Sequence, residues 1–288
     1  MSGSQSSTPG RRLRNVVEPL AANVYFAPEA QEAYTAIGLS SYPESYFSSR
    51  GGCLGQVPGE VIASAFGVFY PPMVAGFVAA AWEKVDVETL LDARRRGATA
   101  ALERILSGKP DGLERATELL QRAAEAGTVA GHPLYAGLLA LEWPGDPIGD
   151  FWRAADLVRE HRGDGHTCAW VAHGLTAPEV LLLTEAWWGL ALHSYSRTRA
   201  WPQHEMEATM ASLRDRGLLD GEQLTPAGEE LRESIEAMTD ATERSVLDAL
   251  GDDVDELTEL LRPWAKAVVD TGGYPTDPAS LSRSVPKS

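Results

Sequence analysis

One short stretch of the sequence concentrates side chains that could move protons or bind an anion. Residues 160–166 read Glu-His-Arg-Gly-Asp-Gly-His, with five ionisable side chains and two glycines. Apolar residues at helical spacing flank this charged stretch, from Phe151 to Val158 and from Cys168 to Ala172, so we expect it to lie inside the fold. Charges placed there must be paired or hydrogen-bonded, because an unpaired buried charge costs several kcal/mol.

A helix through the charged stretch would present an acid–base pair beside an anion-binding group. Arg162 and His166 would share one face, with Glu160 and Asp164 on an adjacent face. His166 is then the candidate proton shuttle, and Asp164 or Glu160 would set its tautomer and raise its pKa. Arg162 would bind an anionic group of the substrate, and His161 is a second candidate base. These assignments make His166, Asp164, His161 and Glu160 the candidate catalytic residues.

The two glycines of the charged stretch leave a second interpretation open. Gly163 and Gly165 would each cost about 1 kcal/mol in a helix interior, so they predict either a close approach to the backbone or a break in the helix. In the second case the charges are a structural ion-pair network that ends one helix and starts the next. Structural networks perturb pKa values as catalytic ones do, so the sequence leaves both interpretations standing.

Aromatic residues near the charged stretch favour a ligand pocket, although core packing is their commoner role. From the first half of the chain, Tyr46 and Arg50 would lie four residues apart on one helix face. The expected ligand is a small hydrophobic or aromatic molecule that carries an anionic group. The candidate ligand-binding residues are Arg162, Arg50, Tyr46, Trp170, Trp187, Trp188 and His193.

Most cofactor and metal signatures are missing from the sequence. It has no Gly-rich phosphate loop after a strand, no HExxH, no cysteine cluster and no GxSxG. The spacing of His161 and His166 matches no standard metal site. We therefore expect no cofactor and no metal, and chemistry limited to acid–base steps such as hydrolysis, dehydration, cyclisation or isomerisation.

Composition indicates a soluble, cytoplasmic protein. The chain has 288 residues, 44% of them hydrophobic, which can supply a sizeable core. Its two cysteines predict no disulfide framework, and the sequence shows neither a signal peptide nor an apolar run that could span a membrane. The formal net charge of −16 opposes an approach to nucleic acid.

Turn and cap signals divide the chain into helices and two lobes. The strongest break is Pro144-Gly145-Asp146-Pro147, where we place the boundary between an N-terminal helical lobe, 11–146, and a second lobe, 147–275. Residues 1–10 are expected to be a disordered tail and residues 276–288 a flexible one. In the first lobe we expect helices at 16–25, 28–37, 86–106, 113–126 and 132–143. Residues 42–50 would place Tyr46 and Arg50 on one face if they are helical, and 58–69 and 71–82 are expected to be buried apolar segments opened by prolines.

The second lobe has the element order of a winged helix-turn-helix. Thr176 and Glu179 form a capping-box pattern that opens a helix through Trp188, and a further helix follows at 201–216. An Asp-Gly turn within 218–225 predicts a small β-hairpin, and two more helices follow it. The expected fold class is mainly α, with two helical lobes and a β-hairpin wing in the second.

The residues around this hairpin carry a family resemblance. The segments 214–221 and 224–228 resemble the recognition helix and wing of MarR-type winged-helix regulators. Over about positions 11–275, including 25–29, 46–50 and the charged stretch, the chain resembles an actinobacterial helix-turn-helix family labelled SalK-like. The resemblance implies a mostly helical, two-lobed protein, often encoded among biosynthetic or regulatory genes. Winged-helix regulators are commonly homodimers through their terminal helices, and we expect the same here.

The charges of the winged-helix segment disagree with DNA reading. Between Asp220 and Arg262 there are fourteen acidic residues against three arginines, and the wing carries no Lys or Arg. We therefore predict a small-molecule-binding protein, a cofactor-independent acid–base enzyme of secondary metabolism, on a scaffold that no longer binds DNA and meets no membrane. The alternative is a ligand-responsive MarR-like transcriptional regulator, whose phosphate contacts would come from residues 11–14 or from Arg197 and Arg199.

Overall fold

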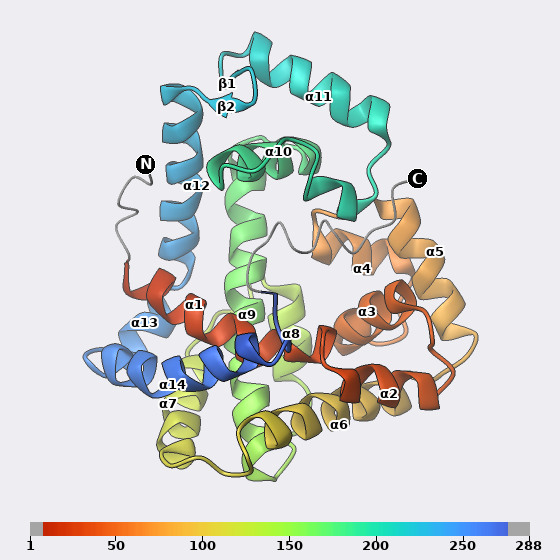
Figure 1. The fold of residues 1–288 in the computed structure, drawn as a ribbon, viewed down its shortest axis with the longest axis vertical. Coiled ribbons are helices and arrows are strands. Elements are labelled where there is room, and N and C mark those ends of the chain that lie inside the picture. Colours follow the sequence, from red (N-terminus) through yellow and green to blue (C-terminus); the bar gives the residue numbers. More distant parts are fainter. Residues whose placement is uncertain (1–7, 276–288) are drawn as a thin grey trace.

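The computed structural model describes residues 8–275 and is mainly helical (Figure 1). This confirms the predicted fold class of a mainly α protein with one small hairpin. The described α-helices are α1 Pro9–Ala22, α2 Pro28–Ala36, α3 Tyr42–Gly51, α4 Gly59–Phe66, α5 Pro71–Trp82, α6 Val87–Ile105, α7 Leu113–Glu125, α8 Pro133–Leu139, α9 Pro147–Ala172, α10 Ala177–Trp187, α11 Gln203–Asp215, α12 Pro226–Thr242, α13 Arg244–Leu250 and α14 Asp253–Asp270. Short 3-10 helices lie at η1 Asn23–Tyr25, η2 Gly52–Leu54 and η3 Ser196–Arg199.

The central element is α9, which contains the charged stretch and stands upright through the middle of Figure 1. The Asp146 side chain caps it by accepting from the Gly149 N–H at 2.8 Å, and the helix continues for 26 residues. The predicted alternative of a helix break at the two glycines is therefore wrong. A Cβ on Gly165 would lie 2.2 Å from Thr242 Oγ1, so this glycine allows the end of α12 to approach the backbone of α9.

The first helix begins earlier than the sequence pattern predicted. Thr8 caps α1 by accepting from the Arg11 N–H at 3.3 Å, and Pro9 occupies the first turn, where its missing N–H costs nothing. Residues 9 and 10 of the expected tail are therefore helical, while residues 1–7 and the expected tail at 276–288 lie outside the described residues. The helix α1 packs against both α9 and α14, so the two terminal helices lie together within one chain (Figure 1).

The elements of the predicted winged helix-turn-helix form a group at the top of Figure 1. The capping box of Thr176 and Glu179 opens α10, and the strands β1 Leu219–Asp220 and β2 Gln223–Leu224 pair antiparallel across Gly221, whose φ is +60°. These elements share their own hydrophobic cluster. The domain boundary at 146/147 stays a prediction. The helix α9, which follows this boundary, packs both on α7 and α8 of the first predicted lobe and on α12 of the second. None of the helices described between residues 8 and 275 combines the length and apolarity that crossing a membrane requires.

Candidate functional site

Within the charged stretch of α9, Glu160 is buried in an ion-pair network that borders the cavity described below. Its carboxylate is 1% exposed and accepts from Arg50 Nε at 2.8 Å and Arg50 Nη2 at 2.7 Å, and it also accepts from Arg159. Burial alone would raise the pKa of Glu160, but the two arginines lower it to about 2. This ion-pair network ties α3 to α9.

Asp164 and His161 also face the body of the protein. Asp164 accepts from the Tyr135 N–H at 3.0 Å, which satisfies a first-turn donor of α8. The His161 ring stacks on His132 with centroids 4.2 Å apart, and its Nε2 accepts from the Thr128 N–H at 3.2 Å. Burial, with a contribution from His132, lowers the pKa of His161 to about 4, so the ring is neutral at pH 7.

The variant Asp164→Asn should gain stability relative to the wild type when the pH is raised from 5 to 8. Burial and the nearby Glu160 raise the pKa of Asp164 to about 7 from a normal 3.8. As the pH rises from about 4 to 7, the unfolded state therefore loses its proton first and the wild type loses stability, whereas asparagine does not titrate. One pKa unit corresponds to about 1.4 kcal/mol. We therefore expect the unfolding free energy of the variant minus that of the wild type to be larger at pH 8 than at pH 5 by at least about 1 kcal/mol. Urea unfolding at both pH values measures it, and an equal difference at both would contradict the ionisation of Asp164 in this range.

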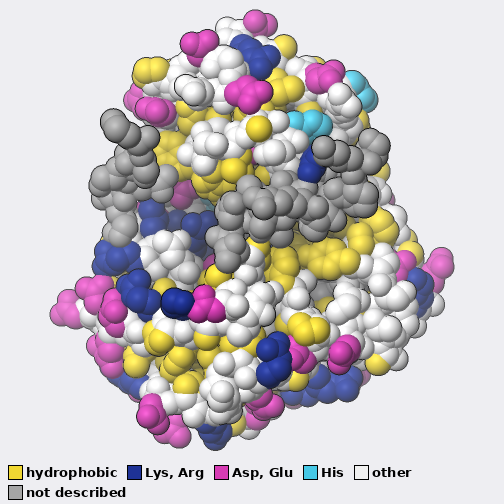
Figure 2. Space-filling view, viewed as in Figure 1, with side chains coloured by type: hydrophobic (Ala, Val, Ile, Leu, Met, Phe, Trp, Pro, Cys, Tyr) yellow, Lys and Arg dark blue, Asp and Glu magenta, His cyan; other side chains and the backbone are white. Residues whose placement is uncertain are grey.

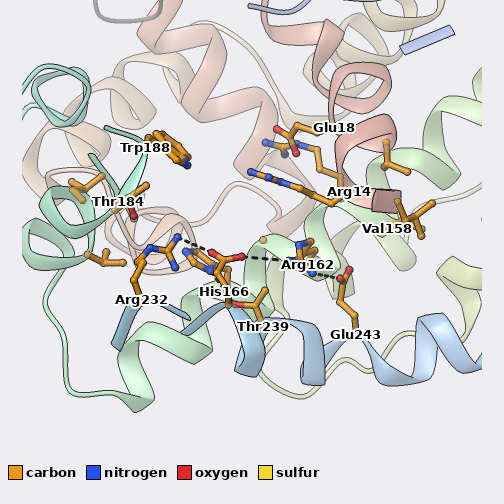
Figure 3. Close-up of a pocket in the computed structure, with 18 of the residues that line it drawn as sticks. Arg14, Glu18, Val158, Arg162, His166, Thr184, Trp188, Arg232, Thr239 and Glu243 are labelled. Atoms are coloured by element: carbon orange, nitrogen blue, oxygen red, sulfur yellow. Dashed lines mark hydrogen bonds and ion pairs between the residues drawn. The ribbon is translucent and has the colours of Figure 1, made fainter. Parts of the chain in front are cut away.

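Next to the ion-pair network of Glu160, α9 faces a cavity of about 300 Å³ that lies between α1, α9, α10 and α12 (Figure 3). From the charged stretch, Arg162, Gly163 and His166 line it. A Cβ on Gly163 would make ordinary van der Waals contacts with Glu160 Oε2 at 3.6 Å and Arg50 Nη2 at 3.9 Å, so a small side chain fits here beside the Glu160–Arg50 pair.

A row of alternating charges forms the polar wall of the cavity. Arg232 Nη2 lies 2.7 Å from Glu236 Oε1, and Arg162 pairs with Glu243 and lies 3.0 Å from Asp240 Oδ1 (Figure 3). Burial would raise the pKa of Glu236, but Arg232 and the neighbouring cations lower it to about 2, so Glu236 is ionised at pH 7. The arginine that was predicted to bind a substrate anion is therefore already paired with carboxylates.

His166 presents a free ring nitrogen to the cavity. Its Nδ1 lies 3.0 Å from Thr239 Oγ1, and the Thr239 hydroxyl donates its own proton to the Ile235 carbonyl at 2.8 Å. The tautomer that carries the proton on Nδ1 satisfies both hydrogen bonds, and it leaves Nε2 as an acceptor with no partner in the described part of the chain. Burial and then Arg232 lower the pKa of His166 to about 4. Neither Asp164 nor Glu160 sets its tautomer, and its pKa is lowered, where the sequence predicted that it would be raised.

The opposite wall is apolar and comes mainly from α10. Val180, Leu181 and Thr184 line it, and Trp188 follows them at the end of the helix. The Trp188 ring is 37% exposed and packs edge-on against Tyr195, with centroids 5.4 Å apart. The cavity is therefore amphipathic, with an arginine-rich wall facing an aliphatic and aromatic one.

The structure brings four of the predicted site residues to the cavity: Arg162, His166, Arg50 and Trp188. Besides Glu160, His161 and Asp164, four predicted ligand contacts do not line it. The Tyr46 hydroxyl accepts from Arg50 Nη1 at 3.4 Å, and Trp170 belongs to the core beneath α10. The Trp187 ring lies beside Arg232, and the His193 backbone N–H donates to Glu185 at 2.7 Å.

Several lining residues were missed, and some had a readable signal. Arg232, Glu236, Thr239 and Glu243 recur every three or four residues, the spacing of one helix face, and this polar row lies on the side of α12 that faces α9. Glu185 had no such signal, because its partners are backbone groups. Its buried carboxylate accepts from the N–H groups of His193, Tyr195 and Ser196, which positions Tyr195 beside the cavity.

Within residues 8–275, no group of three His, Cys, Asp or Glu side chains is arranged to hold a metal ion. Comparison with known families gives one match: the model of a helix-turn-helix family covers residues 10–275 of this chain. No curated protein and no solved structure matches the sequence.

Proposed function

The chain belongs to this helix-turn-helix family, and we propose that it is a small-molecule-binding protein whose ligand lies in the cavity between α1, α9, α10 and α12. The observation that supports this most is the amphipathic cavity itself, which Gly163 and His166 line and where His166 Nε2 lacks a partner among the described residues. Its volume of about 300 Å³ lies at the lower end of the range for small-molecule sites. A ligand there would contact helices of the helix-turn-helix unit and the N-terminal helix at once.

Replacing Gly163 with leucine should block the cavity without unfolding the protein. A Cβ at this position meets no atom closer than 3.6 Å, so the rest of the leucine side chain can extend into the cavity that Gly163 lines. Leucine is also a better helix former than glycine by up to about 1 kcal/mol. We expect the affinity for N-phenyl-1-naphthylamine, a neutral fluorescent probe, to fall at least tenfold while the melting midpoint stays level or rises. Gly163→Ala is the matched control, since it keeps the gain in helix propensity and most of the space. Equal probe binding by the wild type and the leucine variant would refute the cavity as the site.

We further propose that the scaffold does not read DNA through α11 and the wing. Arg214, the cation closest to the wing, donates to the Gly221 carbonyl at 3.0 Å, and Arg216 pairs with Glu179. Exposed Glu207, Asp220 and Glu222 would face a phosphate backbone instead. Several Asp and Glu side chains are visible over α11 and the wing at the top of Figure 2.

Fluorescence anisotropy with labelled duplexes from the neighbourhood of the gene tests this directly. We expect no sequence-specific binding at physiological salt and little binding even at low salt, because few cations are available to release counterions. Tight, sequence-specific binding at physiological salt would favour the alternative of a ligand-responsive regulator, with the same cavity as its effector site. We also propose that the protein is a homodimer and acts in secondary metabolism. The resemblance to the SalK-like family and to MarR-type regulators supports both.

One observation favours an enzyme as a second candidate. His166 lines the cavity and is neutral at pH 7, so Nε2 is available to accept a proton from a bound substrate. With a pKa lowered to about 4 it is a weak base, which suits only an acidic substrate proton. Metabolite profiling of a deletion strain complemented with His166→Asn separates the two functions. If the protein is an enzyme that uses His166, the strain with His166→Asn should accumulate the same compound as the deletion strain. The comparison is valid when the variant protein melts like the wild type.

A further inference from the structure

The arginines that line the cavity differ in their partners. Arg50 pairs with Glu160, Arg159 with Glu18 and Glu160, Arg162 with Glu243 and Asp240, and Arg232 with Glu236. Each of these four guanidinium groups therefore has a carboxylate at close range. They form the fixed polar framework of the site, and a ligand anion would have to compete with protein carboxylates to bind them.

Arg14 is the exception. It extends from α1 into the cavity (Figure 3), hydrogen-bonds Asn15 Oδ1 at 3.3 Å, and forms no ion pair with any described residue. On the same helix, Arg11 lies 2.6 Å from Glu233 and 3.2 Å from Asp240, so carboxylates are not lacking on this side of the protein. Arg14 is also exposed, which leaves its guanidinium accessible to a molecule entering the cavity.

The charge of Arg14 reaches the centre of the site. After burial, Arg232, Arg162 and Arg14 contribute to lowering the pKa of His166, and Glu236 raises it. Three cations therefore act on His166, in a protein whose net charge is −16. Figure 2 shows Lys and Arg atoms gathered at and above the N-terminal end of α1, beside the hollow under the upper helices.

This arrangement fits one negative charge. Glu18 and Glu236, which line the cavity, pair with Arg159 and Arg232, and Arg162 pairs with Asp240 as well as with Glu243, whose pKa burial raises to about 7. A single anion would complete the pairing of Arg14, whereas a second negative charge would enter a partly buried site with no free cation among the described lining residues, at a desolvation cost. Across the cavity, the exposed ring of Trp188 and the Tyr195 ring offer an apolar surface for the rest of the molecule.

We infer that the ligand is an amphipathic monoanion: a hydrophobic ring system that packs on Trp188 and Tyr195, with one negative charge that Arg14 binds. This inference rests on the proposed function, because it concerns the same cavity. It differs from the sequence prediction in giving the anion to Arg14, where the sequence favoured Arg162.

Competition against N-phenyl-1-naphthylamine tests the inference with three compounds that share a naphthalene ring. They are 1-naphthol, which is neutral, naphthalene-1-sulfonate, with one negative charge, and 1-naphthyl phosphate, with two at pH 8. The wild type should prefer the sulfonate at least tenfold over the other two. In Arg14→Gln this preference should fall at least tenfold while the affinity for the neutral probe changes less than twofold. Arg96→Gln, at an exposed arginine of α6 that pairs with Asp92, should behave like the wild type.

Two kinds of failure can be told apart. If the wild type binds the neutral probe and Gly163→Leu does not, but Arg14→Gln keeps the sulfonate preference, the role of Arg14 is refuted and the cavity function stands. A preference for the dianionic 1-naphthyl phosphate would refute the inference that the ligand carries a single negative charge. If the wild type binds no probe, or Gly163→Leu binds all of them normally, the proposed function itself fails and this inference fails with it.

Discussion

Replacing Arg94 with methionine is expected to destabilise the protein by about 3–5 kcal/mol. Arg94 is 2% exposed, and its guanidinium donates to Asp156 at 2.8 and 3.2 Å and to the Tyr25 hydroxyl at 3.0 Å. Asp156 is 0% exposed, so the variant would leave a buried carboxylate without its counter-charge, which is among the costliest changes a core can undergo. For a chain of this size the melting midpoint should fall by roughly 10 °C.

Two further variants make this result specific to the buried pair. Removing both charges in Arg94→Met/Asp156→Leu should recover most of the loss, because an apolar pair of similar volume often replaces a buried ion pair at little cost. Arg96→Met changes an arginine two residues along the same helix that is 57% exposed and should alter stability by less than about 0.5 kcal/mol. A single variant as stable as the wild type would mean that Asp156 finds another partner or binds a proton.

Replacing Glu160 with glutamine is expected to cost about 3 kcal/mol or more. The substitution keeps the shape of the side chain but removes the charge that Arg50 and Arg159 share, and both arginine side chains are only 12–13% exposed. Because the folded-state pKa of Glu160 is lowered to about 2, its stabilising contribution is fully present above pH 4.5 and is lost as the pH falls towards 2. The difference between wild type and variant should therefore shrink in acid.

Chemical unfolding at pH 7 and pH 3 measures both parts of this prediction. Glu259→Gln is the control, since Glu259 is 69% exposed, pairs with Arg262 on the surface, and should change stability by less than about 0.5 kcal/mol. If Glu160→Gln costs less than about 1 kcal/mol at pH 7, the network is not structural, and Glu160 returns as a candidate for the chemistry of the cavity.

These two results would show that the buried carboxylates Asp156 and Glu160 of α9 stabilise the fold through their ion pairs. The sequence posed a choice between a structural ion-pair network and a site, and the structure contains both. The network around Glu160 borders the cavity, because its partners Arg50 and Arg159 also line it. Glu160, His161 and Asp164 hold α3, α8 and the segment before α8, while Arg162, Gly163 and His166 line the cavity. Both interpretations describe part of the same seven residues.

Local signals were enough to predict some elements. The capping box at Thr176, the Asp-Gly turn of the hairpin and the polar spacing of the helices depend on residues within a few positions of one another. The start of α1 was missed because Thr8-Pro9 lies in a Ser/Gly/Pro-rich segment whose composition outweighed its cap signal. A single cap residue is weak evidence when the rest of the segment favours disorder.

The site itself depends on partners that are distant in the sequence. Glu160 and Arg50 are 110 residues apart, and Arg162 and Glu243 are 81 apart, so no local pattern shows that they pair. The same holds for Gly165, whose necessity comes from Thr242 on α12. Sequence reasoning could name residues capable of binding an anion, but which arginine is left without a carboxylate is a property of the packed structure.

A crystal structure of the protein with naphthalene-1-sulfonate would show whether the cavity between α1, α9, α10 and α12 binds an amphipathic monoanion. We predict that the ring system lies between Trp188 and Gly163, and that a sulfonate oxygen lies about 3 Å from the guanidinium of Arg14. The opposite result is an empty cavity with electron density for the compound elsewhere, for example in the open hollow beside Trp82 and Lys84. It would refute the proposal that this cavity is the ligand site.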